Sequence, residues 1–192
     1  MKNDSNWIIV RIDGKIAAIS TDYRHLASIT ARLAKDCKTR YGEITATTAC
    51  FDEVWQLKET TGWEDMMLFG TDFQKKVWKK LYELTRPENN GSPTPRLISY
   101  SDFAELCQNR AGVRAVAHAV GLNPISILIP CHLVVPKEAI DKMKMINKKA
   151  EATIFKGDDL CVESILTDTA IDFGEYALGR ELKRKLILME FE

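Results

Sequence analysis

The 192-residue chain has no apolar run near the about 18 residues that a membrane-spanning helix needs. Its first five residues lack the apolar stretch of a secretion signal. It also has no excess of one charge. Basic and acidic residues number 27 each, with 9 and 10 in residues 1–70 and 18 and 17 in residues 71–192. Bulk charge therefore indicates no partner, and any nucleic-acid surface is expected to be local, with a modest salt dependence.

Disulfide and zinc patterns are missing as well. The five cysteines are odd in number and form no Cys-x-x-Cys pair, and the three histidines have no zinc-site spacing. These features predict an intracellular, reduced protein without a metal, in the cytoplasm or, in a eukaryotic cell, the nucleus. An apolar content of 45% and a charged content of 28% are typical of a soluble globular protein with a substantial core.

Residues 1–69 are predicted to form a small α/β domain with a supporting, structural role. The expected elements are a hairpin of residues 7–12 and 16–19 around Asp13-Gly14, a helix over 25–37 and a strand over 44–49. His25 and Cys37 read as surface or core residues of that helix rather than as ligands. The polar stretch 58–62 reads as a linker.

Residues 70–122 are predicted to be mainly helical. Thr71-Asp72 caps a helix with an apolar stripe and an opposite lysine face, and a surface loop over 86–96 follows. Two short helices, 102–108 and 113–120, then flank a glycine-containing turn. This pattern is typical of a helix-turn-helix, but also of helix pairs that contact no DNA. Arg114 and His118 are four residues apart and so share one face of the second helix.

The stretch 123–135 is the most informative part of the chain. Its apolar run, 125–129, predicts a buried strand that ends at Pro130, because proline cannot continue a central ladder. Cys131 and His132 follow at the end of this strand. A thiol is a nucleophile as its thiolate, and an imidazole can take its proton, so the pair is a candidate site.

These stretches together resemble the O6-alkylguanine-DNA alkyltransferase family. The matching motifs are Gly70-Thr71-Asp72-Phe73-Gln74-x-x-Val77-Trp78, Ser99-Tyr100, Val113-Arg114-Ala115-Val116, Asn123-Pro124, Ile129-Pro130-Cys131-His132 and Gly174-Glu175-Tyr176-x-x-Gly179 with Lys183 and Glu190. Order and intervals both match: Tyr100 to Arg114 is 14 residues, Arg114 to Cys131 is 17 and Tyr176 to Glu190 is 14. The resemblance covers roughly residues 70–136 and 174–192.

The resemblance implies direct DNA repair by a single-turnover methyltransferase, without a cofactor. A monomer would bind double-stranded DNA in the minor groove, flip the damaged nucleotide and move the alkyl group of O6-alkylguanine, or of O4-alkylthymine, to Cys131. Implied catalytic residues are Cys131 as nucleophile, His132 and Glu190 as its activating pair through water, Tyr100 as donor to the leaving base, and Asn123 as the tie between recognition helix and active-site strand. Implied DNA contacts are Arg114, Ala115, Tyr100 and Ala119. The implied pocket walls are Val134, Tyr176 and Ala177.

The resemblance also implies the fold: a ribonuclease H-like α/β domain over 1–69, then a mostly α domain over 70–192. The second domain would hold a winged-helix-like helix-turn-helix, a short active-site strand and an atypical insertion at about 137–170, which begins as a helix-like run.

The chain departs from the family pattern at three places besides the insertion. Leu133 stands where the family has arginine, Ala177-Leu178 stands where a small polar residue and glycine are usual, and Ala117 stands where glycine is common. Leu133, Ala177, Leu178 and the insertion suggest an alternative, a damage sensor that binds O6-alkylguanine without repairing it and recruits other repair. The presence of Cys131, His132 and Glu190 argues against it. A helix-turn-helix regulator without chemistry and a Cys-His hydrolase are weaker alternatives.

Overall fold

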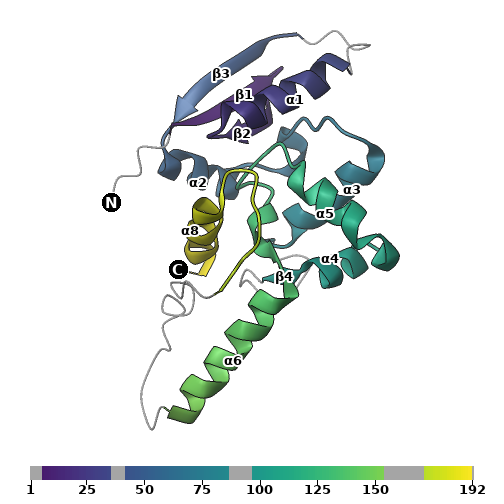
Figure 1. Ribbon diagram of the computed structural model, residues 1–192. Helices are drawn as coiled ribbons and strands as arrows, with labels where there is room; N and C mark the ends of the chain where they lie inside the picture. Colours follow the sequence, from purple (N-terminus) through teal and green to yellow (C-terminus); the bar gives the residue numbers. More distant parts are fainter. Residues whose placement is uncertain (1–5, 36–41, 87–96, 154–170, 192) are drawn as a thin grey trace.

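The fold is mixed α/β, with a three-stranded sheet at one end of the molecule and helices around a two-stranded sheet at the other (Figure 1). The computed structural model describes residues 6–35, 42–86, 97–153 and 171–191. Most of the loop predicted over 86–96 and the insertion from 154 to 170 lie outside these ranges. No helix in the described ranges is long and apolar enough to cross a bilayer.

The predicted N-terminal hairpin and strand are confirmed. Strands β1 (Trp7–Ile12) and β2 (Lys15–Ser20) are antiparallel, and β3 (Ile44–Ala49) pairs with the other edge of β1. Asp13 and Gly14 have φ values of 50° and 79°, as a tight hairpin turn requires. Helix α1 (Tyr23–Lys35) packs on β2, burying Leu26 and Ile29.

The predicted linker at 58–62 is wrong. Its first three residues belong to α2 (Phe51–Thr60), which begins where the Glu53 carboxylate accepts the Cys50 N–H at 2.7 Å. Phe51, Val54 and Leu57 fix this helix to the core, so the polar residues 58–60 continue it without apolar residues of their own. The short helix η1 (Trp63–Asp65) comes next. The misread segment therefore places a lysine, Lys58, on a helix.

The predicted helices of the middle region are confirmed. Helix α3 (Asp72–Glu83) starts with a capping box in which Thr71 and Gln74 bond each other's backbone, and it buries Val77, Trp78 and Leu81. The predicted helix pair comes next. It consists of α4 (Tyr100–Leu106) and α5 (Val113–Gly121), with the short strand β4 (Ile98–Ser99) before α4 and the short helix η3 (Arg110–Gly112) between the two helices. Helix α5 packs on both α3 and α4.

The predicted strand at 125–129 is also wrong, although the whole run is buried. Only Ile125 forms a bridge, to Ile19, and the chain then turns, with Ile127 at a φ of 73°. The turn closes where the Ile129 N–H donates to the Ile125 carbonyl at 3.1 Å. Cys131 therefore begins a short helix, η4 (Cys131–Leu133), and does not end a strand. Strand β5 (Val134–Val135) follows and pairs parallel to β4.

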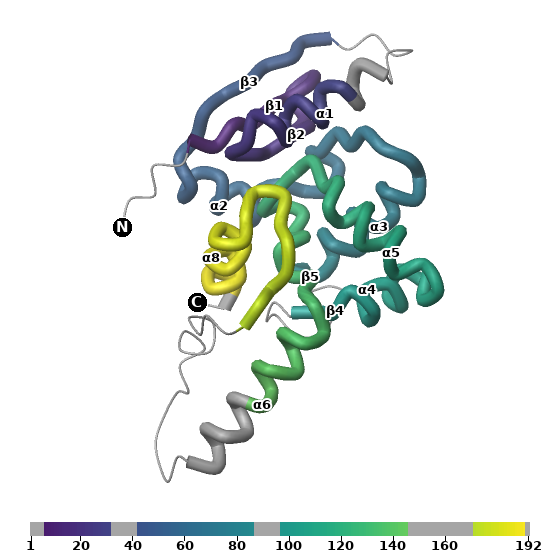
Figure 2. The backbone as a smooth tube through the Cα atoms, in the orientation of Figure 1, coloured from purple at the N-terminus to yellow at the C-terminus, as the bar shows by residue number. Residues whose placement is uncertain are grey.

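Two helices complete the described chain. The helix-like start of the insertion is confirmed as α6 (Lys137–Thr153), and α8 (Arg180–Phe191) packs on η4. Three side chains are buried together beside Val135: Ala139 of α6, Ile187 of α8, and Phe173 of the segment before α8. Figure 2 shows segment 171–179 running along α8 before it turns into that helix.

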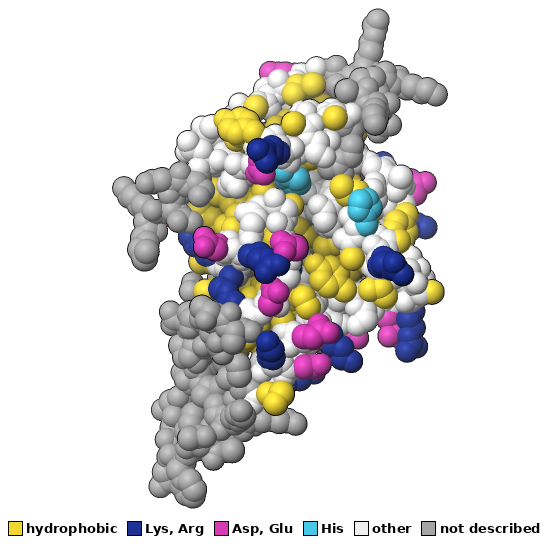
Figure 3. Space-filling view, in the orientation of Figure 1, with side chains coloured by type: hydrophobic (Ala, Val, Ile, Leu, Met, Phe, Trp, Pro, Cys, Tyr) yellow, Lys and Arg dark blue, Asp and Glu magenta, His cyan; other side chains and the backbone are white. Residues whose placement is uncertain are grey.

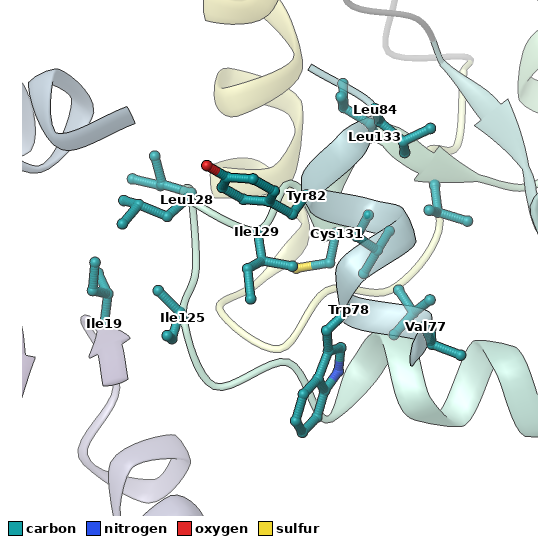
Figure 4. Close-up of a cluster of buried hydrophobic side chains, with 14 of the residues drawn as sticks. Ile19, Val77, Trp78, Tyr82, Leu84, Ile125, Leu128, Ile129, Cys131 and Leu133 are labelled. Atoms are coloured by element: carbon teal, nitrogen blue, oxygen red, sulfur yellow. The ribbon is translucent and has the colours of Figure 1, made fainter. Parts of the chain in front are cut away.

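One hydrophobic core joins elements from both ends of the chain. Trp7, Ile19 and Phe51 belong to the same buried cluster as Trp78 and Cys131. Figure 4 shows Ile19 approaching this cluster on the side of Ile125. The three-stranded sheet is thus packed directly against the segment that carries the candidate site.

Candidate functional site

A cavity of about 340 Å³ opens beside Cys131. Helices α4 and α5, the turn 123–131 and segment 171–179 meet around it. Its lining residues are Tyr100, Ala117, Val120, Gly121, Asn123, Ser126, Cys131, Glu175, Tyr176 and Ala177. Four residues named from the sequence as catalytic or pocket residues, Tyr100, Asn123, Tyr176 and Ala177, therefore surround the thiol.

The Cys131 thiol is 7% exposed and has polar neighbours on its inner side. Nδ2 of Asn123 donates to its Sγ at 3.0 Å, and Oη of Tyr176 lies 4.0 Å from the sulfur. Burial raises the pKa of the thiol, while these two groups and the Lys183 ammonium lower it in part. The thiol is thus held largely protonated, beside groups that can stabilise a thiolate when one forms.

Asn123 sets the shape of the turn that carries Cys131. Its Oδ1 accepts the Ile125 N–H at 3.1 Å, and its Nδ2 donates to the Ile129 carbonyl at 2.8 Å as well as to the sulfur. One amide therefore replaces the ladder partners that a strand would have supplied. Asn123 lies two residues after the end of α5 and so links this helix to the segment that carries Cys131; its expected catalytic role stays a prediction.

His132 and Glu190 form a buried pair behind the thiol. Nε2 of His132 lies 2.9 Å from Oε1 of Glu190, and their side chains are 0% and 4% exposed. A carboxylate only accepts, so Nε2 carries the hydrogen and the neutral ring has its lone pair on Nδ1. This Nδ1 is buried without a hydrogen-bond partner among the described residues.

The charges of this pair are set by burial and by Lys58. Burial lowers the pKa of His132, although Glu190 opposes this effect. Burial alone would raise the pKa of Glu190, but the hydrogen bond from His132 and the Lys58 ammonium outweigh it and the pKa is lowered. The pair is therefore a neutral imidazole beside an ionised carboxylate.

Lys183, on α8, is a second buried cation near the cavity. It is 1% exposed, and its Nζ donates to the carbonyls of Val134 at 2.9 Å and Glu175 at 3.4 Å. Burial lowers its pKa to about 8, against the opposing charges of Cys131, Asp172 and Glu175. Its Nζ lies 5.9 Å from the centre of the Tyr100 ring.

Helix α5 presents one exposed face next to the cavity. Arg114 and His118 are exposed there, as their spacing predicted, and so is Ala115. Ala119 is different, because its side chain is 1% exposed and its carbonyl accepts the Trp78 indole N–H at 2.8 Å. The predicted DNA contact by Ala119 is therefore wrong: this small residue permits close packing of α5 on α3.

The predicted pocket wall at Val134 is also wrong. Val134 is fully buried in β5 and, among the described residues, is not part of the cavity lining; its carbonyl accepts a hydrogen bond from Lys183. Leu133, which departs from the family pattern, is also a core residue, because its side chain is fully buried in the core cluster (Figure 4). Ala177, in contrast, is exposed and lines the cavity.

Two polar residues of the site were missed by the sequence interpretation. Ser126, 2% exposed, lines the cavity together with Tyr176, but it lies inside the run that was read as a strand. Lys58 pairs with Glu190, which is 132 residues away. No local sequence pattern could indicate that pair. The helical spacing of Phe51, Val54 and Leu57 could, however, have predicted that the helix extends to Lys58. The described residues contain no cluster of three or more His, Cys, Asp or Glu side chains suited to a metal.

Fold and site together define a mixed α/β protein in which a helix pair borders a cavity that contains a buried cysteine. Residues 72–152, from α3 through the helix pair and Cys131 to α6, match the sequence profile described as "6-O-methylguanine DNA methyltransferase, DNA binding domain". Through these residues the chain is similar to the O6-methylguanine-DNA methyltransferase family.

Relatives in other organisms match over a similar part of the chain. A probable methylated-DNA–protein-cysteine methyltransferase of Acanthamoeba polyphaga mimivirus is 47% identical over 73 residues, which are 38% of this chain and 44% of that protein. The Haemophilus influenzae methylated-DNA–protein-cysteine methyltransferase is 42% identical over 69 residues, 36% of this chain and 34% of that protein. The matched region thus spans less than half the length of either relative.

A solved structure extends the likeness in fold to nearly the whole chain. The O6-methylguanine-DNA methyltransferase of Pyrococcus kodakaraensis superposes with a TM-score of 0.53 and 22% identity. The superposition covers 99% of this chain and 95% of that protein. At this identity the likeness concerns the fold.

Proposed function

We propose that this protein repairs DNA by moving the alkyl group of O6-alkylguanine, and likewise of O4-alkylthymine, irreversibly to Cys131. The observation that carries the proposal is the position of the Cys131 thiol, in the wall of a cavity bordered by Tyr100, Asn123 and Tyr176. The names of the relatives, methylated-DNA–protein-cysteine methyltransferases, support the same reaction.

The reaction requires a thiolate and a stabilised leaving base. The Cys131 proton passes through water to Nδ1 of His132, which has a free lone pair, and Glu190 stabilises the resulting imidazolium. The sulfur then attacks the alkyl carbon, the carbon–O6 bond breaks and its electron pair remains on the purine. Tyr100 donates a hydrogen bond or proton to that base as charge develops. No cofactor takes part, and the thioether formed ends the turnover.

Asn123 and Lys183 favour the thiolate that this reaction needs. The amide hydrogen bond and the buried ammonium both act against the effect of burial on the Cys131 thiol. Tyr176 and Ala177 would contact the flipped base, because both line the cavity from segment 171–179.

Double-stranded DNA would bind along the exposed face of α5. Arg114 would enter the base stack from the minor groove and fill the space of the flipped nucleotide, and Ala115 would allow close approach. The face seen in Figure 3 carries interspersed basic and acidic side chains among the described residues, in keeping with a local contact and a modest salt dependence.

The same proposal includes the organisation of the chain. A ribonuclease H-like domain, 1–69, would support a DNA-binding and alkyl-transfer domain, 70–192, with a winged-helix-like helix pair and the insertion at about 137–170. The protein would act as a monomer, in the cytoplasm or in the nucleus of a eukaryotic cell, where its substrate lies.

Mass spectrometry of the protein mixed with a duplex that contains one O6-methylguanine tests the reaction. We expect one added methyl group per protein, on the peptide that contains Cys131, together with repaired DNA. The Cys131→Ser variant should leave the DNA unchanged. The control variant Cys50→Ser makes the same substitution at an exposed cysteine and should react like the unchanged protein. Tight binding of the damaged duplex without transfer would contradict the proposal and indicate the damage-sensor alternative.

A further inference from the structure

Lys58 of α2 reaches into the buried pair behind the thiol. Its ammonium pairs with Oε1 of Glu190, the same oxygen that lies 2.9 Å from Nε2 of His132. The Lys58 side chain is only 14% exposed. One carboxylate oxygen thus joins a cation from near the start of the chain to the imidazole next to Cys131.

Contacts around α2 fix the position of Lys58. Nη1 of Arg86 donates to the Lys58 carbonyl at 2.7 Å, and the Tyr82 hydroxyl donates to the Thr61 carbonyl at 3.2 Å. The Lys58 ammonium also lies over the Trp55 ring, 4.1 Å from its centre. Groups at the end of α3 and on α2 itself therefore hold the last turn of α2 against the site.

On the basis of the proposed function, we propose that Lys58 is a positioning residue of the alkyl-transfer site. Its ammonium keeps Glu190 a carboxylate, and that carboxylate fixes the Nε2–H tautomer of His132. The Nδ1 lone pair is then left free to take the Cys131 proton. The N-terminal part of the chain would in this way supply one member of a network whose other members lie in the C-terminal part.

The burial of the pair makes a cation necessary. A carboxylate that is 4% exposed is costly in free energy unless it is paired, and a neutral imidazole supplies no charge. The charged groups around the pair are Lys58 of α2, Arg86 after α3 and Lys183 of α8. Of these, Lys58 alone among the described residues bonds Glu190, so its removal should let the pair take up a proton more readily.

Long-range ¹H–¹⁵N NMR of the His132 ring tests the inference without any reaction. In the unchanged protein we expect the Nε2–H tautomer, and in Lys58→Met we expect His132 to take up its proton at a pH about one unit higher, a usual effect of losing one close charge. Lys58→Arg, which keeps the charge, should restore the titration. Lys185→Met is the matched control, since Lys185 of α8 lies over the Phe51 ring of α2 and does not contact Glu190 among the described contacts.

Single-turnover transfer to Cys131, measured against pH, gives the second readout. The acidic limb of the profile should move up by about one pH unit in Lys58→Met and return in Lys58→Arg. A purely structural role for Lys58 would lower thermal stability without moving this limb. If Lys58→Met does not fold, Lys58→Gln, which keeps an N–H donor without the charge, replaces it.

The two proposals fail in distinguishable ways. Absence of transfer by the unchanged protein would overturn the proposed function, while the NMR titration would still test Lys58. A folded Lys58→Met or Lys58→Gln with an unaltered His132 tautomer, titration and pH profile would overturn the role of Lys58 and leave alkyl transfer intact.

Discussion

At the residue scale, the site contains buried charged side chains that folding alone does not require. Lys183 is the clearest case, because its side chain is 1% exposed and its ammonium hydrogen-bonds only backbone carbonyls within the described part of the chain. Its pKa is lowered to about 8 by burial. Such a group is retained against a free-energy cost, which fits a role beside the thiolate rather than in the core.

Lys183→Met should reveal this cost through pH. The unfolded chain holds the lysine proton more tightly than the folded chain, so the unchanged protein gains stability as pH rises from about 8 toward 10.5. Relative to Lys183→Met, this gain should approach roughly 3 kcal/mol. Denaturant unfolding of both proteins at several pH values between 7 and 10 measures the difference, with Lys185→Met as control. A difference that does not change with pH would mean that the Lys183 ammonium is solvated.

The residues of the site differ in how far the sequence could predict them. The motif around Asn123 and the Pro130-Cys131-His132 sequence identified the candidate nucleophile, and His132 does meet Glu190, although their catalytic roles stay predictions. Val134 and Ala119 were misplaced, since resemblance indicates a position in the chain but not which way a side chain points. Lys58 was missed because its partner is remote in sequence.

At the scale of the elements, regular helices followed from periodicity and the turn 123–131 did not. Capping residues and apolar spacing predict α3, α4 and α5, since local sequence decides them. The run 125–129 has the composition of a strand, but Asn123 takes its backbone hydrogen bonds and folds it into a turn. A side-chain amide that substitutes for a neighbouring strand is a tertiary feature, which composition does not show.

Helix α5 provides a matched pair of substitutions. Ala115→Leu changes an exposed residue and should alter the free energy of unfolding by less than about 0.5 kcal/mol, yet weaken binding to duplex DNA. Ala119→Leu places the same bulk against α3 and should destabilise the protein by about 1–3 kcal/mol. Urea unfolding and fluorescence anisotropy with a labelled duplex measure the two effects. Unchanged DNA affinity of Ala115→Leu would argue against α5 as the DNA-facing helix.

At the scale of the whole molecule, the three-stranded sheet supports the site directly. The Ile19 N–H donates to the Pro124 carbonyl at 3.0 Å, and the Ser126 N–H donates to the Ile19 carbonyl at 3.2 Å. These bonds attach the edge strand β2 to the turn that carries Cys131. The proposed domain boundary at residue 70 therefore separates two stretches of sequence that share a core and a hydrogen-bonded edge.

This shared core predicts that both parts unfold together. Ile29→Ala removes a buried side chain between α1 and the sheet, in a different buried cluster from Cys131, and should destabilise the protein by about 2–5 kcal/mol. Ile19→Ala makes a similar deletion beside the turn that carries the thiol. The urea midpoint of Cys131 exposure is measured by pulsed maleimide labelling and peptide mass spectrometry, and the midpoint of overall unfolding by tryptophan fluorescence. In a cooperative molecule both variants shift these two midpoints by the same amount. If Ile29→Ala moved the fluorescence midpoint but left Cys131 protected to the same urea concentration, the sheet would unfold separately. Support of the site would then come from the local bonds of Ile19 alone.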